Sequence, residues 1–304
     1  MILPFDAHNH IHMGPTAPVQ ALLSPEQATA TIQEHESPLA TALPIASLSG
    51  MAIMSTHLRD FDRVMHLNKT LPEKVQGNLR VVPCFGIHPW WLHELTEEDW
   101  QVVDNSPRWI HELEARVSSH PDAIVGEIGL DGFHFDPVTK ELTSPMEKQM
   151  EAFRLQMELA ARLERPVSIH TVQCFGSLFE TMTKVKKDAK KNKLQKALPP
   201  KMYFHAFGGK IGTIDQLLAL CGRQPGVVYF GFAPVINFRS PKTADVIRKI
   251  GIERLVLETD HEDAAYVPES VVQCINYLAS TLEIDEEEVV ERTTANAFAL
   301  YGLN

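Results

Sequence analysis

The sequence has few cysteines, no long apolar run and no excess of positive charge. Its 304 residues include four cysteines, and no two of these form a Cys-x-x-Cys pair. Isolated cysteines of this kind are typical of free thiols in a reducing compartment, and they do not predict a disulfide framework. No segment reaches the apolar length that a membrane-spanning helix needs. We therefore expect no contact with a membrane.

The start of the chain and its net charge bear on the cellular compartment and on binding to nucleic acid. Residues Met1 to Asp6 include no basic leader, which argues against secretion, so we expect a cytoplasmic or nuclear protein. The formal net charge of -11 repels polyanions, which argues against binding a long duplex by broad phosphate neutralisation. One basic run extends from Lys184 to Lys201. Such runs are usually solvated helix faces, and a nucleic-acid contact or an import signal is the alternative.

Short apolar runs rich in β-branched residues recur along the chain, separated by longer segments. This alternation predicts βα units around a parallel sheet. A chain of 304 residues is long enough for two domains, but α/β barrels of this size commonly form one, and no linker divides the sequence. We therefore predict a TIM-type (β/α)8 barrel, a single α/β domain over residues 1–304. The eight predicted strands are 2–8, 46–54, 81–87, 123–128, 166–170, 202–205, 227–233 and 254–259.

The segments between these strands have helical periodicity of varying strength. Residues 143–164 carry apolar side chains at helical spacing after Ser144 and Pro145, which predicts an amphipathic helix. Residues 13–44 are rich in proline and alanine and lack apolar periodicity, so we interpret them as an insertion near the mouth of the barrel. Weaker helical patterns cover 58–67, 97–117, 177–194, 213–220, 242–250 and 268–282, and residues 285–304 predict a last helix.

The stretch Asp6-Ala-His-Asn-His10 follows the first apolar run. In an extended chain, side chains two residues apart lie on the same face, so His8 and His10 can bind one divalent cation together. Neutral imidazoles suit zinc and similar metals. An isolated His-x-His pair is also compatible with two ordinary hydrogen-bonded histidines.

Later strands carry polar residues of the same kind at their ends. Because the carboxyl ends of parallel barrel strands meet on one face, where active sites are assembled, these residues are expected to share a pocket. Each one alone is compatible with a core histidine or a helix cap. Their repeated placement favours a common site made of His88, Glu127, His170, His205 and Asp260 together with His8 and His10.

These motifs resemble those of the TatD family of metal-dependent deoxyribonucleases, which belongs to the amidohydrolase-like barrel enzymes. Within the family, the chain resembles the fungal branch of Cut9-interacting proteins, which implies a protein partner of the Cut9 type. The matching segments, in family order and over nearly the whole chain, are Asp6 to His10, Gly86 to Pro89, Val125 to Asp131, Pro166 to His170, Phe204 to Gly209, Leu257 to Asp260 and Thr294 to Phe298.

The sequence also departs from the family pattern at three points. Ile11-His12 stands where the family commonly has Leu-Asp, Thr171 to Cys174 replace an Arg- and Asp-containing turn, and His261 to Ala264 replace a turn with proline and an aromatic residue. These changes spare the metal-ligand residues and affect the expected substrate contacts.

The resemblance implies two divalent ions per chain, which could be Zn, Mg or Mn. His8, His10, Glu127 and Asp260 would surround one ion, and Glu127 would bridge to a second ion bound by His170 and His205. Two ions about 3.5 to 4 Å apart can activate a shared water and clamp the attacking and leaving oxygens of a phosphodiester. Asp260 is the candidate general base. His88 is expected to contact the phosphate or leaving group, or to shape its own turn, and Asp131 and His12 to orient ligands.

The function expected from these residues is deoxyribonuclease activity of an exonuclease-like kind on DNA ends or single strands. One alternative is hydrolysis of a small amide, lactone or phosphate ester, because the same barrel and metal site support many reactions. A second alternative is a metal-binding interaction protein without nuclease activity. Retention of every expected ligand argues against the second alternative.

Overall fold

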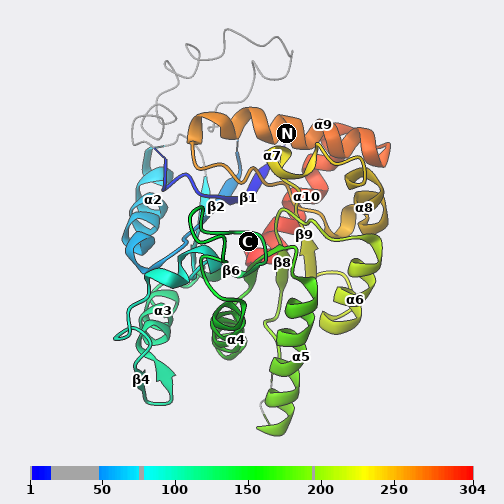
Figure 1. Ribbon diagram of the computed structural model, residues 1–304. Helices are drawn as coiled ribbons and strands as arrows, with labels where there is room; N and C mark the ends of the chain where they lie inside the picture. The colour runs from blue at the N-terminus through cyan, green and yellow to red at the C-terminus, as the bar shows by residue number, and fades with distance from the viewer. Residues whose placement is uncertain (1, 15–47, 75–78, 194–195, 304) are drawn as a thin grey trace.

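A computed structural model describes residues 2–14, 48–74, 79–193 and 196–303. Its centre is a curled sheet of parallel strands surrounded by helices (Figure 1). The strands occur in the spatial order in which they follow along the chain, as expected for successive βα units. They are β1 (Phe5–Asn9), β2 (Gly50–Met54), β3 (Arg80–Phe85), β6 (Ile124–Asp131), β7 (Val167–Val172), β8 (Met202–Phe204) and β9 (Val228–Phe230). Seven of the eight predicted strands are thereby confirmed, with ends that shift by a few residues.

The eighth predicted strand, 254–259, is not a regular strand, which corrects the sequence-based prediction. Its backbone nevertheless lies between β9 and β1 and connects the two edges of the sheet. Beside this connection, the Asp6 carboxylate accepts the backbone N–H of Thr259, at 3.0 Å. The connecting bonds run from Val256 N–H to the Phe230 carbonyl (3.1 Å), from Ala7 N–H to the Leu257 carbonyl (2.8 Å) and from Asp260 N–H to the His8 carbonyl (2.9 Å). These bonds close the sheet, so the predicted TIM-type barrel is the observed architecture.

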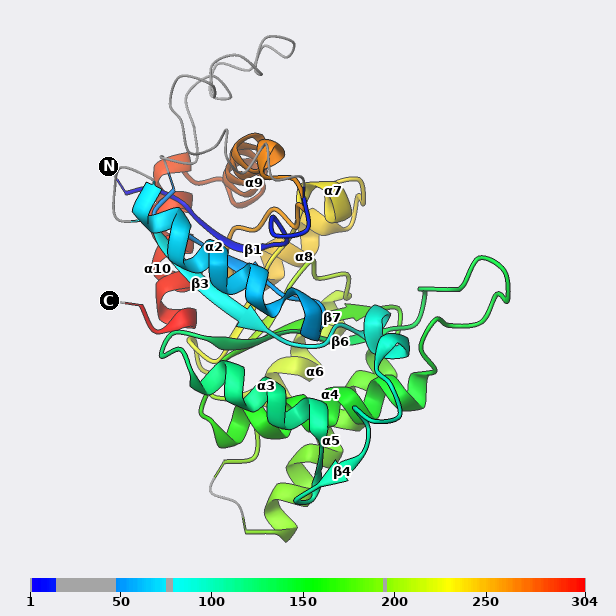
Figure 2. The ribbon, with the colours of Figure 1, turned by 90° about the vertical axis from the view of Figure 1, so that its left-hand side faces the viewer.

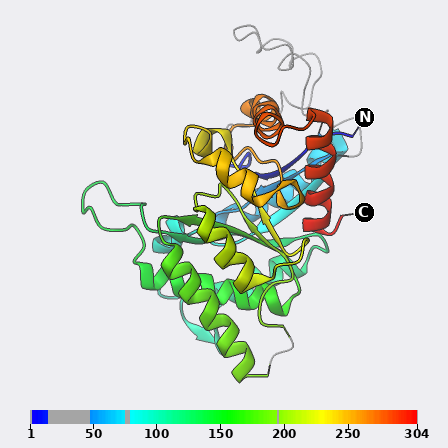
Figure 3. The ribbon, with the colours of Figure 1, turned by 90° about the vertical axis from the view of Figure 1, so that its right-hand side faces the viewer.

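Helices cover the outside of the sheet, as the three views show (Figures 1, 2 and 3). The longer helices each bury an apolar face; in α4, for example, Phe153 and Met157 are fully buried. No helix in the described ranges combines the length and the apolar character that crossing a membrane requires. The helices are α2 (Phe61–Lys74), α3 (Arg108–Ser118), α4 (Met146–Arg162), α5 (Phe175–Lys191), α6 (Ile211–Cys221), α7 (Pro234–Asn237), α8 (Thr243–Ile250), α9 (Val267–Leu282) and α10 (Glu286–Tyr301), with short 3-10 turns η2 (Leu58–Asp60), η3 (Pro89–Glu94), η4 (Ile252–Arg254) and η5 (Ala264–Tyr266).

The predicted helix over 97–117 is correct only in its second half. Its first half contains a two-stranded hairpin of β4 (Val102–Val103) and β5 (Ser106–Pro107), and α3 begins after Pro107. The two turn residues, Asp104 and Asn105, both have positive φ, at 47° and 71°. Two left-handed residues between paired strands form the kind of turn that matches the twist of a hairpin, and this explains why the helix starts late.

The last helix, α10, lies beside the start of β1 (Figure 2). The Tyr301 ring lies 5.6 Å from the ring of Phe5, and its hydroxyl donates to the Ala7 carbonyl at 2.6 Å. The predicted C-terminal helix is therefore confirmed. Most of the predicted insertion at 13–44 falls at 15–44, outside the described residues, so that prediction stands untested.

Candidate active site

The predicted site residues meet at the carboxyl ends of the barrel strands. Although they are spread over more than 250 positions in the sequence, six of the seven line one cavity of about 440 Å³. Glu127 departs from the expected position, because it lies inside β6 and not at its end. The cavity is lined by His10, His88, Glu127, His170, His205 and Asp260, and His8 lies behind it with no exposed surface.

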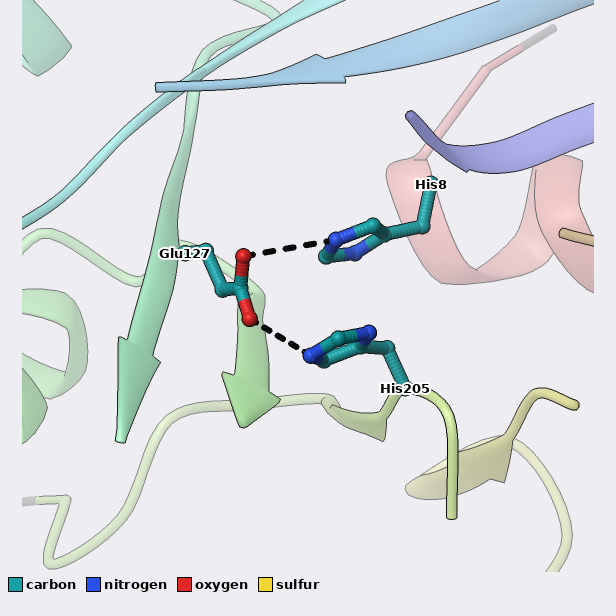
Figure 4. A group of neighbouring side chains, drawn as sticks. All are labelled: His8, Glu127 and His205. Atoms are coloured by element: carbon teal, nitrogen blue, oxygen red, sulfur yellow. Dashed lines mark ion pairs between the residues drawn. The ribbon is translucent and has the colours of Figure 1, made fainter. Parts of the chain in front are cut away.

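Glu127 is the centre of this arrangement, and its side chain is only 2% exposed. Oε2 of Glu127 lies 3.4 Å from Nε2 of His8 and 3.0 Å from Nε2 of His10. Oε1 lies 2.5 Å from Nε2 of His205 (Figure 4). The rings of His8 and His205 stack in parallel 3.9 Å apart while facing the two oxygens of one carboxylate. Strand β1 and the end of β8 thus present imidazole nitrogens to a single acidic group.

Two further histidines approach the same oxygen, Oε1 of Glu127. Nδ1 of His170 lies 3.0 Å away and Nε2 of His88 lies 3.3 Å away. On the other side of the site, Oδ1 of Asp260 lies 3.6 Å from Nε2 of His8 and 3.7 Å from Nε2 of His10. Three groups of side chains could each hold a metal ion, because within each group the ligand atoms lie within 4.8 Å of one another. These groups are His8, His10 and Asp260; His8, Glu127 and His205; and His88, Glu127 and His170. These groups overlap with the two ligand sets predicted from the sequence but are not identical to them. His205, predicted to pair with His170, is grouped with His8, and His88, which was not predicted as a ligand, is grouped with His170.

Hydrogen bonds outside the cluster determine how the first two histidines present their rings. Nδ1 of His10 lies 2.9 Å from the carbonyl of Met54, and because a carbonyl only accepts, this nitrogen carries a proton. Nδ1 of His8 lies 3.1 Å from the hydroxyl of Ser168. In both rings Nε2 is therefore the nitrogen that faces Glu127. Such orienting partners are characteristic of histidines that bind metal.

His170 is oriented by Asp131, the last residue of β6. Nε2 of His170 donates to Oδ2 of Asp131 at 3.0 Å, which leaves Nδ1 facing Glu127. The same carboxylate oxygen accepts the indole N–H of Trp90 at 2.7 Å. The expectation that Asp131 orients a ligand is consistent with this contact. His12, by contrast, pairs with Asp60 at 3.1 Å and is separated from the ring of His10 by 6.0 Å between centroids.

The ring of His88 is oriented opposite to that of His170, because it faces Glu127 with Nε2 and not with Nδ1. Its Nδ1 accepts the backbone N–H of Trp90 at 3.2 Å, where the chain enters η3. Burial lowers the pKa of His88 to about 4, so the ring is neutral at pH 7 and its proton is on Nε2. This nitrogen points at the cluster as a hydrogen-bond donor. The sequence-based alternatives, phosphate contact and shaping of the turn, are both compatible with the geometry.

The cluster surrounds one buried carboxylate with imidazole rings. Burial works to raise the pKa of Glu127, but the surrounding imidazoles, led by His205, hold it well below the usual range. Burial likewise works to lower the pKa values of His10 and His170, and the nearby carboxylates outweigh it and raise both to about 9. Burial raises the pKa of Asp260. The buried carboxylate therefore demands cationic partners, which a metal ion can supply.

The donor atoms fit divalent metal ions. Nδ1 of His205 is buried and has no hydrogen-bond partner within the described ranges. Oε1 of Glu127 has three imidazole nitrogens within 3.3 Å but makes no hydrogen bond of regular geometry to any of them. An unsatisfied carboxylate oxygen amid imidazole nitrogens is costly unless a cation binds it. Imidazole and carboxylate groups are typical ligands for Zn and Mn. None of the described residues that line the cavity is lysine or arginine, whereas Glu127, Asp131, Asp260 and Glu262 are acidic.

Sequence reasoning missed several residues that support the site. Ser168, Trp90 and the carbonyl of Met54 each position a predicted ligand or its partner. Ser168 stands two residues before His170 on β7, so its side chain could have been expected on the same face, whereas the other two contacts depend on how loops fold. None of the described residues of the basic run lines the cavity. Lys186 in α5 donates to the Leu220 carbonyl at 2.6 Å, and Lys196 pairs with Glu164 at 2.6 Å.

The chain is similar to known proteins over nearly its whole length. Residues 5–302 match the family model described as TatD related DNase. The chain is 26% identical to the Cut9-interacting protein scn1 of Schizosaccharomyces pombe, with 83% of this chain and 91% of the relative covered. It is 27% identical to the human deoxyribonuclease TATDN3, with 84% and 85% covered. The crystal structure of the TatD homologue YJJV from Escherichia coli K12 has the same fold, with a TM-score of 0.70 and 22% identity over 99% of this chain and 98% of that one. The chain therefore belongs to the TatD related DNase family.

Proposed function

We propose that the protein is a metal-dependent hydrolase that cleaves phosphodiester bonds in DNA with two divalent ions bound around Glu127. The observation that carries this proposal is the convergence of five imidazole nitrogens on the two oxygens of one buried carboxylate. The family to which the chain belongs supports the same conclusion. Relatives named as deoxyribonucleases support DNA as the substrate.

Glu127 would bridge the two ions because its oxygens face different sets of ligands. Oε2 faces His8 and His10, next to Asp260, and Oε1 faces His170 and His205. When bound, two such ions lower the pKa of a shared water and neutralise the charge that develops on the phosphodiester oxygens. Zn, Mg and Mn are all candidates, since imidazole favours Zn and carboxylate also suits Mg and Mn.

Asp260 is the proposed general base. Its side chain is 16% exposed and lines the cavity, so a water molecule bound there can reach Oδ1. Its backbone N–H donates to the His8 carbonyl at 2.9 Å, which fixes the carboxylate beside the histidine pair. Asp260 would take the proton of the attacking water, and a positioned carboxylate is suited to this role.

His88 is the proposed phosphate-contacting residue. Its Nε2–H group points into the cluster beside Oε1 of Glu127, at 3.3 Å, and the ring is held by the Trp90 backbone. A neutral donor at this position would bind a phosphate oxygen or the departing oxygen of the substrate without competing for the metal ions.

The cavity favours an end or an unpaired segment of a strand over the middle of a duplex. Glu127 is 2% exposed, at the bottom of a cavity of about 440 Å³, which lies in the range of small-ligand pockets. A phosphodiester flanked by paired bases on both sides could not enter far enough to reach it. We therefore propose exonuclease-like action on DNA ends or single strands.

A labelled single-stranded oligonucleotide tests this function. We expect it to be shortened in the presence of Mg, Mn or Zn, and we expect Glu127→Ala and Asp260→Asn to abolish shortening. The exposed residue Asp122, which does not line the cavity, offers a control in Asp122→Asn for unspecific effects of removing a carboxylate. Equal activity of the wild type and both site variants would refute the assignment.

A small amide, lactone or phosphate ester is the alternative substrate, because the size of the cavity also fits such molecules. A panel of esters, amides and oligonucleotides distinguishes the two. A second candidate, a protein contact of the Cut9 type, is favoured by the name of the fission-yeast relative. Purified protein that binds far less than one ion per chain, and stays inactive after metal addition, would favour that contact over catalysis.

For location, the candidates are the cytoplasm and the nucleus. The support is chemical: Cys84, Cys174, Cys221 and Cys274 are all free thiols, as is usual in reducing compartments. Localisation of a fluorescent fusion tests this.

A further inference from the structure

The rim of the metal-binding cavity carries aromatic side chains that are unusually exposed. Phe133 is 60% exposed and Trp90 is 37% exposed, and both line the cavity together with His134. Phe133 and His134 belong to the segment that links β6 to α4, which projects from the body of the molecule on the side of the site (Figures 2 and 3). Large apolar side chains exposed beside a site of polar chemistry indicate a binding surface.

Hydrogen bonds hold this rim in place. Oδ1 of Asp131 accepts the backbone N–H groups of Phe133 and His134, at 2.7 and 3.0 Å. The ring of His134 stacks on that of Trp90, with centroids 4.2 Å apart and planes inclined by 14°. The indole N–H of Trp90 donates to the other oxygen of Asp131. The aromatic groups are therefore preorganised, and binding a flat ligand would cost little side-chain ordering.

The rest of the projecting segment is a closed loop. Thr143 returns to His134 and donates to its carbonyl through both its backbone N–H and its hydroxyl, each at 3.0 Å. Farther out, the Asp136 backbone N–H donates to the Glu141 carbonyl at 2.8 Å, and the Asp136 carboxylate accepts the N–H of Val138 and of Thr139. These bonds fix the direction in which the chain presents Phe133.

The acidic side chains that line the cavity favour contacts with a neutral, aromatic part of a ligand. The described lining residues include four carboxylates and no lysine or arginine, so the protein side chains offer little attraction to phosphate groups beyond the metal site. Affinity for a polynucleotide must then come from the metal site and from contacts with the bases. Stacking on aromatic side chains is the usual sequence-tolerant contact with unpaired bases.

We propose that Phe133, with the stacked pair Trp90 and His134, forms a platform on which an unpaired nucleobase stacks when its strand enters the cavity. The proposal rests on the proposed function, since it places the base next to the phosphodiester at the metal site. The occupant is a base of a single strand, because the face of a base in a duplex is covered by its neighbours. The platform would explain how an acidic protein selects unpaired ends.

Phe133→Ala tests the platform, and Phe135→Ala is its matched control. Phe135 lies in the same loop, is 46% exposed and touches Phe133 edge-on at 5.8 Å, but does not line the cavity. Binding of fluorescein-labelled dT8 with nuclease-resistant phosphorothioate linkages is measured by anisotropy with Mn present, so that the metal site stays loaded while cleavage is suppressed. We expect Phe133→Ala to weaken binding by about 5- to 100-fold, the range for loss of one stacked base. Phe133→Trp should restore binding, and Phe135→Ala should match the wild type.

A dT8 analogue with abasic residues separates stacking from other contacts. The wild type should prefer dT8 to the analogue both in binding and in kcat/KM for cleavage, and Phe133→Ala should reduce both preferences toward one. Equal binding of dT8 and the analogue by the wild type, or equal losses in Phe133→Ala and Phe135→Ala, would overturn the platform. If the wild type cleaves neither oligonucleotide but still prefers dT8 in binding, the proposed nuclease function fails and the platform stands.

Discussion

Asp131 accepts a hydrogen bond from Nε2 of His170 at 3.0 Å. Through the same carboxylate it holds the indole of Trp90 and the backbone of Phe133 and His134. Burial works to raise the pKa of Asp131, and the contact with His170 outweighs it and lowers the pKa, so the group is ionised at neutral pH. One carboxylate thus connects a proposed metal ligand to the rim of the cavity.

Asp131→Asn should weaken metal binding by about 10- to 100-fold, which is the usual cost of losing an orienting partner of a ligand. In the wild type, Oδ2 accepts hydrogen bonds from both His170 and Trp90. The neutral amide of asparagine carries no negative charge and therefore holds these two donors more weakly. Metal affinity is measured by calorimetry, with kcat/KM for dT8 as the second readout. Asp136→Asn is the control, since Asp136 lies in the same loop and caps only exposed backbone. Wild-type metal affinity in Asp131→Asn would contradict the orienting role.

Ser168→Ala removes the hydroxyl that contacts Nδ1 of His8 at 3.1 Å. The smaller side chain fits the site, so we expect the fold to persist while metal affinity falls by about 10-fold. Ser49→Ala is the comparison, because the Ser49 hydroxyl also bonds a neighbouring strand, at the Pro4 carbonyl, but lies away from the ligands. A loss of the same size in both variants would indicate a general effect on packing.

Asp6→Ala should destabilise the fold by about 3 kcal/mol or more, because it leaves several buried donors unpaired, each at a cost of about 1 to 3 kcal/mol. The Asp6 carboxylate is fully buried and accepts the N–H and hydroxyl of Thr259, at 3.0 and 2.9 Å, and the amide of Asn9, at 2.9 Å. It therefore connects β1 to the irregular segment that closes the barrel. Urea unfolding in EDTA measures the effect, and the exposed Asp122 provides a neutral control in Asp122→Ala. A change below about 1 kcal/mol would show that closure depends on other contacts.

The four thiols should react slowly in the folded protein. Burial raises the pKa of Cys174 to about 11 and that of Cys221 to about 12, and it raises the pKa values of Cys84 and Cys274 well above the usual range. All four are therefore protonated at pH 8, and the thiol is the unreactive form. Mass spectrometry after iodoacetamide treatment should find four modified cysteines only after unfolding in guanidinium. Rapid modification of any of them in the native protein would be inconsistent with this environment.

The barrel and the central cluster could be predicted from the sequence because they depend on regular periodicity. Alternating strands and helices predict the sheet, and the carboxyl ends of parallel strands bring His170 and His205 together without knowledge of the loops. The segment 254–259 was predicted as a strand from its apolar residues. Its backbone bonds to Asp6, a partner more than 250 residues away, and no local pattern contains that contact.

The contacts that orient the ligands were harder to predict. Asp104 and Asn105 form a turn inside a predicted helix because their backbone conformations are left-handed, which their residue types allow but do not require. The bond between Trp90 and Asp131 spans 41 residues and depends on how two loops fold against each other. The grouping of His205 with His8 follows from the curvature of the closed barrel, and the strand ends alone did not indicate it.

The most direct test is a titration of metal-free protein with Mn or Zn while bound metal and cleavage of a single-stranded oligonucleotide are both followed. The two-ion proposal predicts that activity rises with metal and saturates at two ions per chain, and that Glu127→Ala neither binds two ions nor cleaves. Full activity at one ion per chain, or cleavage by Glu127→Ala at the wild-type rate, would contradict it.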